Sequence, residues 1–312
     1  MLHHISDEMV ERAADARQAQ DVVEEAFRAF GRGQAAMQQR ERIEAEGVKL
    51  STLGAVVPHL GIAGAKVYTT IAGRFSFVIL LFSCLDGRPL ATMDAAALTR
   101  RRTAASSVLM ARRMARPDAG RLGVFGLGAQ GGEHVRQFAG AYPLRSVLVS
   151  DPGVPDAVLD GLSKEVGLPV ERADADAIVR SSDIVVTASR SAAALFRGAD
   201  VAPGTFIAAV GSSLPHTREL DDATLARAEV IAVEWRRQSL EEAGDLRLAD
   251  PTLDLAARTR EFAEVLAEPG SLRGGAPRGL FIYKAVGVGL QDIALAGHVY
   301  RQVAQGQGWD LP

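Results

Sequence analysis

The stretch LGVFGLGAQG, residues 122–131, decides the fold of this chain. An apolar run over 122–125 leads directly into three glycines, Gly126, Gly128 and Gly131, and a helical segment follows. In this pattern the first glycine permits a tight turn, the second lets the backbone approach a pyrophosphate, and the third allows close helix–strand packing. The helix N-terminus then offers free N–H groups to phosphate. The stretch therefore predicts a dinucleotide-binding Rossmann unit.

A carboxylate follows this loop at the distance that an adenosine ribose requires. The next apolar run, residues 146–150, ends at Asp151, which lies 20 residues after Gly131. An aspartate there accepts hydrogen bonds from the ribose hydroxyls and repels a 2′-phosphate, and no arginine follows immediately. We therefore predict NAD as the cofactor, with NADP as the alternative. In the competing interpretation, the glycines form an ordinary turn and Asp151 caps a helix.

Apolar runs alternate with helical segments on the C-terminal side of this loop. The runs lie at residues 121–126, 145–150, 183–188, 205–210 and 229–234. This alternation is typical of a doubly wound parallel sheet. Residues 37–94 instead contain branched and aromatic runs separated by turn signals, which predict an antiparallel sheet. Long helices are expected over 95–116 and 290–303. The predicted fold class is α/β, a Rossmann sheet with a second α+β domain.

Two further strand ends are expected at the edge of the parallel sheet where ligands bind. Thr187 and Ser189 end the run at 183–188, and Gly211 follows the run at 205–210. We predict that these three residues contact the ribose or the nicotinamide. The alternative is that they are plain loop residues.

Length and charge exclude several classes of function. A chain of 312 residues is expected to form two domains. Its 35 basic and 38 acidic side chains give a net charge of −3, which offers no field for nucleic acid or for an anionic membrane. The longest apolar run, residues 75–82, is too short to span a bilayer. Chemistry on a small molecule is therefore favoured.

Cysteine and histidine usage adds two expectations. Cys84 is the only cysteine, which indicates a reducing cytoplasm, and its apolar surroundings predict a buried, inert thiol. The six histidines show no metal-ligand spacing, so we predict no metal. His59 and His216 are candidates for a proton donor, although a simple loop histidine is the more common case.

Four cations in the first third of the chain form a candidate anion-binding set. Arg42 lies on a predicted strand, Lys66 lies inside an apolar strand, and Arg102 lies in the long helix. A lysine in such a strand needs a partner or a ligand, because burying an unpaired ammonium is expensive. Arg74 adds a second carboxylate site if it points into the same pocket. The alternative for each residue is a surface or ion-paired cation.

Taken together, these segments resemble the ornithine cyclodeaminase/mu-crystallin family. The similarity covers nearly the whole chain in the expected order. It rests on Gly64-Ala65-Lys66, Asp86 to Ala91, Leu98-Thr99 with Arg102 to Ala105, Gly126 to Gly131, Gly211 with Pro215 and Arg218-Glu219-Leu220, and Gly287 with Asp292.

The resemblance implies a domain organisation and a set of site residues. A substrate-binding and dimerisation domain is formed by residues 1–117 and 283–312, around a Rossmann domain at 118–282. Family members are typically homodimers joined through the sheet of the first domain. The matching residues assign Arg42, Lys66 and Arg102 to the substrate carboxylate, Asp292 to the substrate nitrogen or nicotinamide, and Thr103, Ala129 and Gln130 to the cofactor.

One departure from the family pattern narrows the chemistry. The cyclodeaminases carry a catalytic aspartate two residues before the proline of the loop after Gly211, and here Ser213 stands there. A serine does not act as the carboxylate base that ornithine chemistry needs. The sequence is therefore more similar to the ketimine-reductase branch.

These features predict NAD(P)H-dependent reduction of an α-imino acid to an amino acid, or the reverse dehydrogenation. Lys66, Asp292 and Ser213 are the candidate catalytic residues. Arg74 raises the alternative of a dicarboxylic substrate such as iminosuccinate. Two other functions are an ornithine or lysine cyclodeaminase, and a cofactor-dependent binding protein of the mu-crystallin type.

Overall fold

The computed structural model describes residues 2–273 and 279–312 and divides the chain into two compact units. The first unit is Met1–Ser106 with Gly287–Pro312, and the second is Ser107–Val286. The sequence placed these boundaries at 117/118 and 282/283. In the structure the first boundary lies between Ser106 and Ser107, inside one unbroken helix, α3 (Ala96–Met114). The helical sequence pattern of α3 gives no sign of this division.

The sheet of the first unit is a meander with one added strand. β2, β3, β4, β5, β6 and β7 pair in antiparallel fashion, which confirms the antiparallel sheet predicted for residues 37–94. β1 joins the edge strand β7 in parallel. The strands are β1 (His3–Ile5), β2 (Ala36–Met37), β3 (Glu41–Ala45), β4 (Val48–Val57), β5 (Ile62–Ile71), β6 (Arg74–Ser83) and β7 (Pro89–Asp94).

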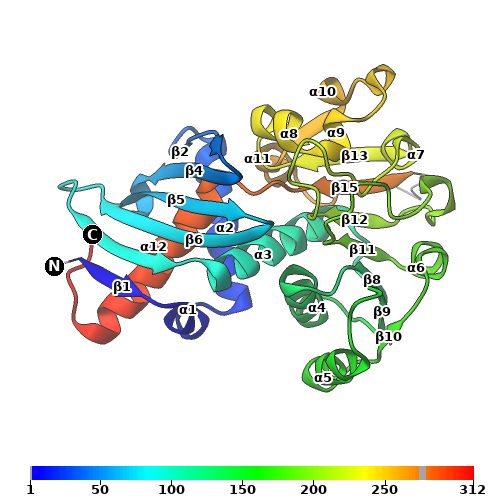
Figure 1. Cartoon of the computed structure of the whole chain (residues 1–312), viewed down its shortest axis with the longest axis horizontal. Coiled ribbons are helices and arrows are strands. Elements are labelled where there is room, and N and C mark those ends of the chain that lie inside the picture. The colour runs from blue at the N-terminus through cyan, green and yellow to red at the C-terminus, as the bar shows by residue number, and fades with distance from the viewer. Residues whose placement is uncertain (1, 274–278) are drawn as a thin grey trace. The chain divides into compact units, whose positions relative to one another are not determined.

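One face of this sheet is covered by α12 (Gly289–Gln307), the red helix of Figure 1, which packs on β4 and β5. Small residues make the approach close. A Cβ atom on Gly289 would lie 2.3 Å from the carbonyl oxygen of Gly54 on β4, so only glycine fits. α12 is buried over most of its length, because α2 (Ala16–Gly31) packs on it as well. α1 (Asp7–Ala13) and the short helix η1 (Pro58–Leu60) complete the unit.

The second unit is built on an eight-stranded sheet whose strands all pair in parallel (Figure 1). Its order is β10-β9-β8-β11-β12-β15-β13-β14. The first six strands reproduce the order 3-2-1-4-5-6 of dinucleotide-binding folds, with the change of direction between β8 and β11. The strands are β8 (Arg121–Phe125), β9 (Ser146–Ser150), β10 (Val170–Arg172), β11 (Ile184–Thr187), β12 (Phe206–Ala209), β13 (Ala228–Val233), β14 (Thr259–Glu261) and β15 (Leu280–Lys284).

This parallel sheet confirms the predicted α/β class. The central strands are fully buried because helices follow most of them in the chain. The helices are α4 (Ala129–Ala141), α5 (Asp156–Val166), α6 (Ala175–Ser181), α7 (Asp222–Ala226), α8 (Arg236–Glu242), α9 (Gly244–Arg247), α10 (Leu255–Arg258) and α11 (Phe262–Ala267), with the 3-10 turns η2 (Gly198–Asp200) and η3 (Pro251–Leu253).

The expectation of a buried Cys84 is wrong. β6 ends at Ser83, and Cys84 begins the exposed turn that leads to β7. In the sequence the apolar run of β6 continues to Cys84, but Ser83 is the last residue of the strand that faces inward. Sequence alone therefore suggested that the thiol is buried. Within residues 2–273 and 279–312, no helix combines the length and the apolar character that crossing a membrane requires.

Candidate active site

A buried ionic cluster in the first unit joins three elements. Lys66 comes from β5, Arg102 from α3 and Asp292 from α12. The Asp292 Oδ1 atom accepts hydrogen bonds from Lys66 Nζ at 3.2 Å and from Arg102 Nε at 2.9 Å. All three side chains are nearly inaccessible to water. The structure therefore brings together three residues that the sequence singled out separately.

Burial and neighbouring charge perturb both ends of this cluster. Burial lowers the pKa of Lys66 to about 8, with Asp292 opposing the shift and Arg102 adding to it. Burial by itself would raise the pKa of Asp292, but Arg102 and Lys66 hold that pKa below its usual value. Lys66 also donates to the Thr99 hydroxyl at 2.7 Å and lies 4.6 Å from the centre of the Phe77 ring. Its ammonium group is therefore held from several sides.

The second guanidinium near Lys66 belongs to Arg40, and Arg42 lies farther along the strand. Arg40 is buried, donates to the Gly287 carbonyl at 2.7 Å and contributes to the lowered pKa of Lys66. Arg42 is half-buried on β3 and pairs in register with Ser51. Only Glu41 separates the two arginines in the sequence, so their roles are distinguished only by the tertiary structure.

Gly287 is the point where the two guanidinium groups meet. Its backbone has a φ of +75°, which favours glycine, and a Cβ atom there would lie 2.8 Å from Arg102 Nη2. The carbonyl of the same residue accepts the hydrogen bond from Arg40. Any side chain at this position would displace Arg102 from the cluster.

Arg74 does not join this cluster. Lys66 pairs with Ile79 across the β5–β6 ladder, and Arg74 pairs with Ile71. Because side chains alternate along a strand, Arg74 lies on the face of the sheet opposite to Lys66 and is exposed. The structure therefore gives no support to a second carboxylate site built on Arg74.

The cluster around Lys66 carries a net positive charge. Lys66, Arg102 and Arg40 supply three positive charges, and Asp292 supplies the one negative charge. Arg102 gives Nε to Asp292 and Nη1 to Gln291, while its Nη2 donates to no atom of residues 2–273 or 279–312. Asp292 Oδ2 is buried and likewise accepts no hydrogen bond from this part of the chain. One donor, Arg102 Nη2, and one acceptor, Asp292 Oδ2, thus remain available to a polar ligand.

The three glycines of the loop after β8 have three different environments in the second unit. Gly126 has a φ of +87°, and its Cβ would lie 2.8 Å from the Ala188 carbonyl oxygen. A Cβ on Gly131 would lie 2.1 Å from the Gly126 carbonyl oxygen, so the start of α4 packs directly on the turn. Nothing lies within 4 Å of the Cβ position of Gly128, so no protein atom demands glycine there. A ligand backed against Gly128 would demand it.

The carboxylate of Asp151 lies against this loop. Its Oδ2 accepts from the Leu127 N–H at 2.8 Å, and its Oδ1 accepts from the Gly153 N–H at 3.0 Å. Arg172 on β10 donates to the Asp151 carbonyl at 2.7 Å, so a guanidinium also lies close by. The sequence did not reveal this cation, because Arg172 is far from Asp151 in the chain.

The first turn of α4 is anchored by a buried histidine. His134 Nδ1 donates to the Gln130 carbonyl at 2.7 Å, and His134 Nε2 accepts from the Ser107 hydroxyl at 2.9 Å. A carbonyl only accepts, so Nδ1 carries the proton. The first turn of α4, which begins with Ala129 and Gln130, is therefore held in place by His134. The Gln130 side-chain oxygen in this turn is buried and has no hydrogen-bond partner among the described residues.

His134 predicts a pH dependence of stability. Burial lowers its pKa from 6.5 to about 4, so the folded protein holds the ring neutral where the unfolded chain protonates it. The stability that comes from keeping His134 neutral is fully present above pH 6.5 and is lost as the pH falls toward 4. This loss amounts to about 3 kcal/mol in the free energy of unfolding. Urea unfolding of the wild type and of His134→Gln at pH 7 and pH 4.5 measures it. The two proteins should differ less at pH 4.5, and an unchanged difference contradicts the assignment.

Glu219, which was not among the predicted site residues, joins the ends of β11 and β12. Its carboxylate accepts hydrogen bonds from the hydroxyls of Thr187 and Ser189 and from the N–H groups of Ser189, Gly211 and Ser212, all within 3.2 Å. Gly211 must be glycine because a Cβ there would lie 2.2 Å from the Ser189 carbonyl oxygen. The Thr187 and Ser189 hydroxyls are thus committed to Glu219.

Two other predicted site residues occupy ordinary positions. Thr103 donates its hydroxyl to the Thr99 carbonyl one turn earlier in α3. Ser213 is half-buried, and its N–H donates to the Gly211 carbonyl at 3.1 Å. Among the described residues, no three histidine, cysteine or acidic side chains are grouped to hold a metal ion.

The model of the ornithine cyclodeaminase/mu-crystallin family matches residues 1–307. The chain belongs to this family.

This family member is similar to proteins of known name. It is 30% identical over 256 residues to the Delta(1)-pyrroline-2-carboxylate reductase of Paracoccus denitrificans, covering 77% of this chain and 79% of the relative. A solved structure of a probable ornithine cyclodeaminase from Bordetella pertussis Tohama I is 53% identical over both full chains, with a TM-score of 0.97. The iminosuccinate reductase of Paracoccus denitrificans, solved with NAD⁺, is 26% identical over 98% of this chain and 97% of that one, with a TM-score of 0.88.

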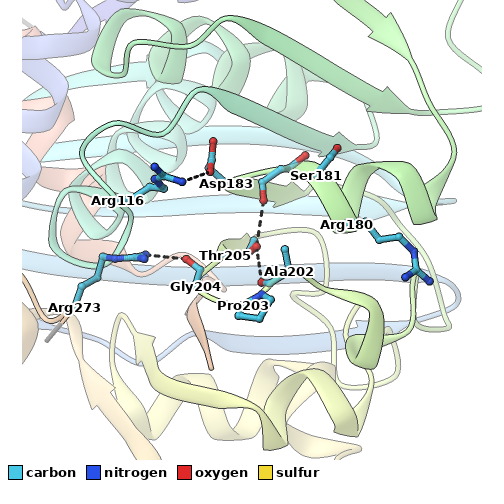
Figure 2. A pocket seen from close by; sticks show the side chains of 10 residues that line it. Arg116, Arg180, Ser181, Asp183, Ala202, Pro203, Gly204, Thr205 and Arg273 are labelled. Carbon is cyan, nitrogen blue, oxygen red and sulfur yellow. Dashed lines mark hydrogen bonds and ion pairs between the residues drawn. The ribbon is translucent and has the colours of Figure 1, made fainter. Parts of the chain in front are cut away.

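The family member also carries a polar pocket of about 310 Å³ at the other edge of the parallel sheet (Figure 2). It is lined by residues that precede β11 and β12, so it lies at the amino ends of the strands, away from the glycine loop. Two of its three arginines already form ion pairs, Arg116 with Asp183 and Arg180 with Asp200. Arg273 donates to the carbonyls of Met114 and Gly204 and so joins two chain segments.

Proposed function

We propose that this chain is an NAD(P)H-dependent reductase that converts an α-imino acid to the amino acid, or runs the reverse dehydrogenation. The observation that carries the proposal is the buried cluster of Lys66, Arg102, Arg40 and Asp292. It is positively charged overall, and it keeps one guanidinium nitrogen and one carboxylate oxygen unbonded within the described chain. An α-imino acid presents a carboxylate and a cationic nitrogen on neighbouring atoms.

Each group of the cluster has a task in this proposal. Arg102 Nη2 and Lys66 Nζ bind the substrate carboxylate, because two cations offset the loss of its hydration. Asp292 Oδ2 accepts the N–H of the iminium and offsets its positive charge. Together these contacts fix the imine carbon in one orientation. Gln291, which accepts from Arg102 Nη1 at 3.0 Å and donates to the Ser106 hydroxyl at 2.8 Å, keeps the guanidinium in place.

The residues of the second unit fit a dinucleotide. The open Cβ position of Gly128 and the N–H groups at the start of α4 suit a pyrophosphate, and Asp151 suits the adenosine ribose. The dinucleotide supplies the hydride. The Asp151 carboxylate supports NAD, and the nearby Arg172 guanidinium makes NADP the alternative to compare.

Two other functions follow from particular observations. The similarity to a probable ornithine cyclodeaminase supports ornithine or lysine cyclisation, but Ser213 takes the place of the family's catalytic aspartate. A binding protein of the mu-crystallin type keeps the glycine loop and has no need of the cationic cluster. Lys66 and Arg102 therefore support an enzyme.

A substrate panel tests the proposal. Oxidation of NADH and of NADPH is followed with ammonia plus glyoxylate, pyruvate or oxaloacetate, and with a cyclic imine carboxylate. Turnover with at least one imino acid is expected. Ammonia release from ornithine without net NADH formation would instead support the cyclodeaminase, and saturable ligand binding without any turnover would support the binding protein. Since Arg74 lies on the other face of the sheet, oxaloacetate is not expected to be preferred.

Lys66 predicts how carboxylate binding depends on pH. Its pKa is lowered to about 8, so the ammonium is charged below pH 8 and loses its proton as the pH rises. The affinity for pyruvate, measured without ammonia by calorimetry, should fall by up to about tenfold for each pH unit above 8. In Lys66→Arg the cation does not titrate, and the affinity should stay level up to pH 10. Parallel profiles for the two proteins would rule Lys66 out as the titrating group.

We also propose a homodimer that forms through the outer face of the first sheet. This face, opposite to α12, exposes apolar residues from three neighbouring strands, namely Val48, Leu50, Val56, Val67, Ile71 and Val78. Several exposed apolar side chains on one face of a sheet are a feature of protein–protein interfaces. Light scattering should give twice the 33.1 kDa chain mass. The single cysteine, Cys84, agrees with a protein of the reducing cytoplasm.

A further inference from the structure

The carboxylate of Glu219 lies at the centre of a dense set of hydrogen bonds in the second unit. It is fully buried and accepts five hydrogen bonds. Oε1 takes the N–H and hydroxyl of Ser189, and Oε2 takes the hydroxyl of Thr187 and the N–H groups of Gly211 and Ser212. The five donors are shared between both carboxylate oxygens, each of which accepts at least two hydrogen bonds.

The negative charge of Glu219 is not neutralised by a cation. No lysine, arginine or histidine of residues 2–273 or 279–312 forms an ion pair with it. The neighbouring buried carboxylate differs in this respect, since Asp245 pairs with the fully buried Lys284 at 2.9 Å. Asp245 in turn accepts from the N–H groups of Glu219 and Leu220 and so fixes the backbone beneath Glu219. The fold therefore holds one net negative charge at a fixed place.

That place is the carboxyl edge of the parallel sheet. Glu219 binds the ends of β11 and β12, and the Gly126 turn after β8 packs on Ala188 and Ser189 at the end of β11. In a sheet of this order the adenosine half of a dinucleotide lies over the strands around β9. The nicotinamide half lies over β11 and β12, on the other side of the change of direction. Glu219 would therefore lie beneath the nicotinamide half of a dinucleotide bound at this edge.

We propose that Glu219 stabilises the positive charge of the oxidised nicotinamide ring, and that this site binds NAD⁺ in preference to NADH because of it. The proposal rests on the proposed function. When hydride leaves C4 with both bonding electrons, the dihydronicotinamide is oxidised and its ring becomes a cation, while the iminium carbon gains the hydride and its nitrogen becomes a neutral amine. A fixed negative charge under the ring lowers the energy of that product and of the transition state that leads to it.

Two substitutions separate the charge of Glu219 from its hydrogen bonds. Glu219→Gln removes the charge. Its amide nitrogen cannot accept a hydrogen bond, so it would face either the N–H group of Ser189 or the N–H groups of Gly211 and Ser212 without bonding to them. Glu219→Asp keeps the charge but shortens the side chain, so it disturbs the same donors. Glu171→Gln removes one charge from an exposed position on β10 and serves as the control.

The test compares equilibrium affinities for NAD⁺ and NADH in these proteins. NADH is titrated by its fluorescence, and NAD⁺ is titrated by displacement of NADH. We expect Glu219→Gln to weaken NAD⁺ binding about tenfold more than NADH binding. Glu219→Asp should weaken both and keep most of the preference, and Glu171→Gln should change neither. Equal losses for NAD⁺ and NADH in Glu219→Gln would overturn the proposal and leave Glu219 with a structural role.

A second measurement needs no variant and covers the case in which Glu219→Gln does not fold. Benzamide adenine dinucleotide has the shape of NAD⁺ but an uncharged ring. The wild-type protein should bind it about tenfold more weakly than NAD⁺, and equal binding would overturn the proposal. If the wild type binds none of these dinucleotides, the proposed function itself fails, which is a different result from equal binding.

Discussion

Arg102→Ala should lower kcat/KM for the imino acid by about 10²- to 10³-fold while the affinity for NADH stays unchanged. Arg102 gives two hydrogen bonds to Asp292 and Gln291 and keeps Nη2 for the substrate. Removing one partner of a buried, hydrogen-bonded charge pair typically costs about 3–5 kcal/mol. Steady-state kinetics with the best substrate of the panel, together with NADH titration, measure both quantities.

The matched control for this variant lies on the same helix. Arg100 is two residues away on α3, and its ion pair with Glu11 is partly exposed. Arg100→Ala should keep kcat/KM within about twofold, because exposed ion pairs contribute little. If Arg102→Ala turned over the imino acid like the wild type, Arg102 would not be the carboxylate-binding residue, and the assignment of the cluster would fail with it.

Gly131→Ala should abolish dinucleotide binding. Its Cβ would lie 2.1 Å from the Gly126 carbonyl oxygen, a distance that no Cβ atom tolerates. The turn and the first residues of α4 must therefore separate, which moves the N–H groups that face the pyrophosphate. We expect at least a 100-fold loss of NADH affinity and a loss of about 2 kcal/mol in the free energy of unfolding. NADH titration and urea unfolding provide the two numbers.

A second glycine of α4 provides the control. Nothing lies within 4 Å of the Cβ position of Gly140. Gly140→Ala should leave NADH binding unchanged and stabilise the protein by about 0.5–1 kcal/mol, since alanine favours a helix more than glycine does. Should Gly131→Ala bind NADH as tightly as Gly140→Ala does, the loop after β8 would not be the pyrophosphate site.

Much of the fold was accessible from the sequence because its signals are local. The glycine spacing of residues 126–131, the buried runs and the turn residues each act over a few positions, and they predicted the parallel and antiparallel sheets. Strand order depends on contacts between distant segments. The insertion of β15 between β12 and β13 was therefore not foreseen, and the unit boundary inside α3 leaves no mark on the helical pattern.

The site divides in the same way. Lys66, Arg102 and Asp292 stood out because a charge in an apolar segment or at a family position is conspicuous, and the structure joins them in one cluster. Glu219 was quoted only as part of the matching segment, because a glutamate in a loop is usually solvated, and only the folded structure shows its five donors. Arg74 was overvalued because strand pairing, which sets its face, is not readable from sequence alone.

The surplus of positive charge around Lys66 has a practical consequence for identifying the substrate. Like charges confined in the folded state repel each other, and a bound carboxylate relieves that repulsion only while the protein is folded. A ligand at about 100 times its dissociation constant adds about 2.7 kcal/mol to the free energy of unfolding. A library of carboxylic acids screened by melting temperature would therefore rank candidate substrates without any assumption about cofactor or reaction, and Arg102→Ala would show which of the shifts are specific.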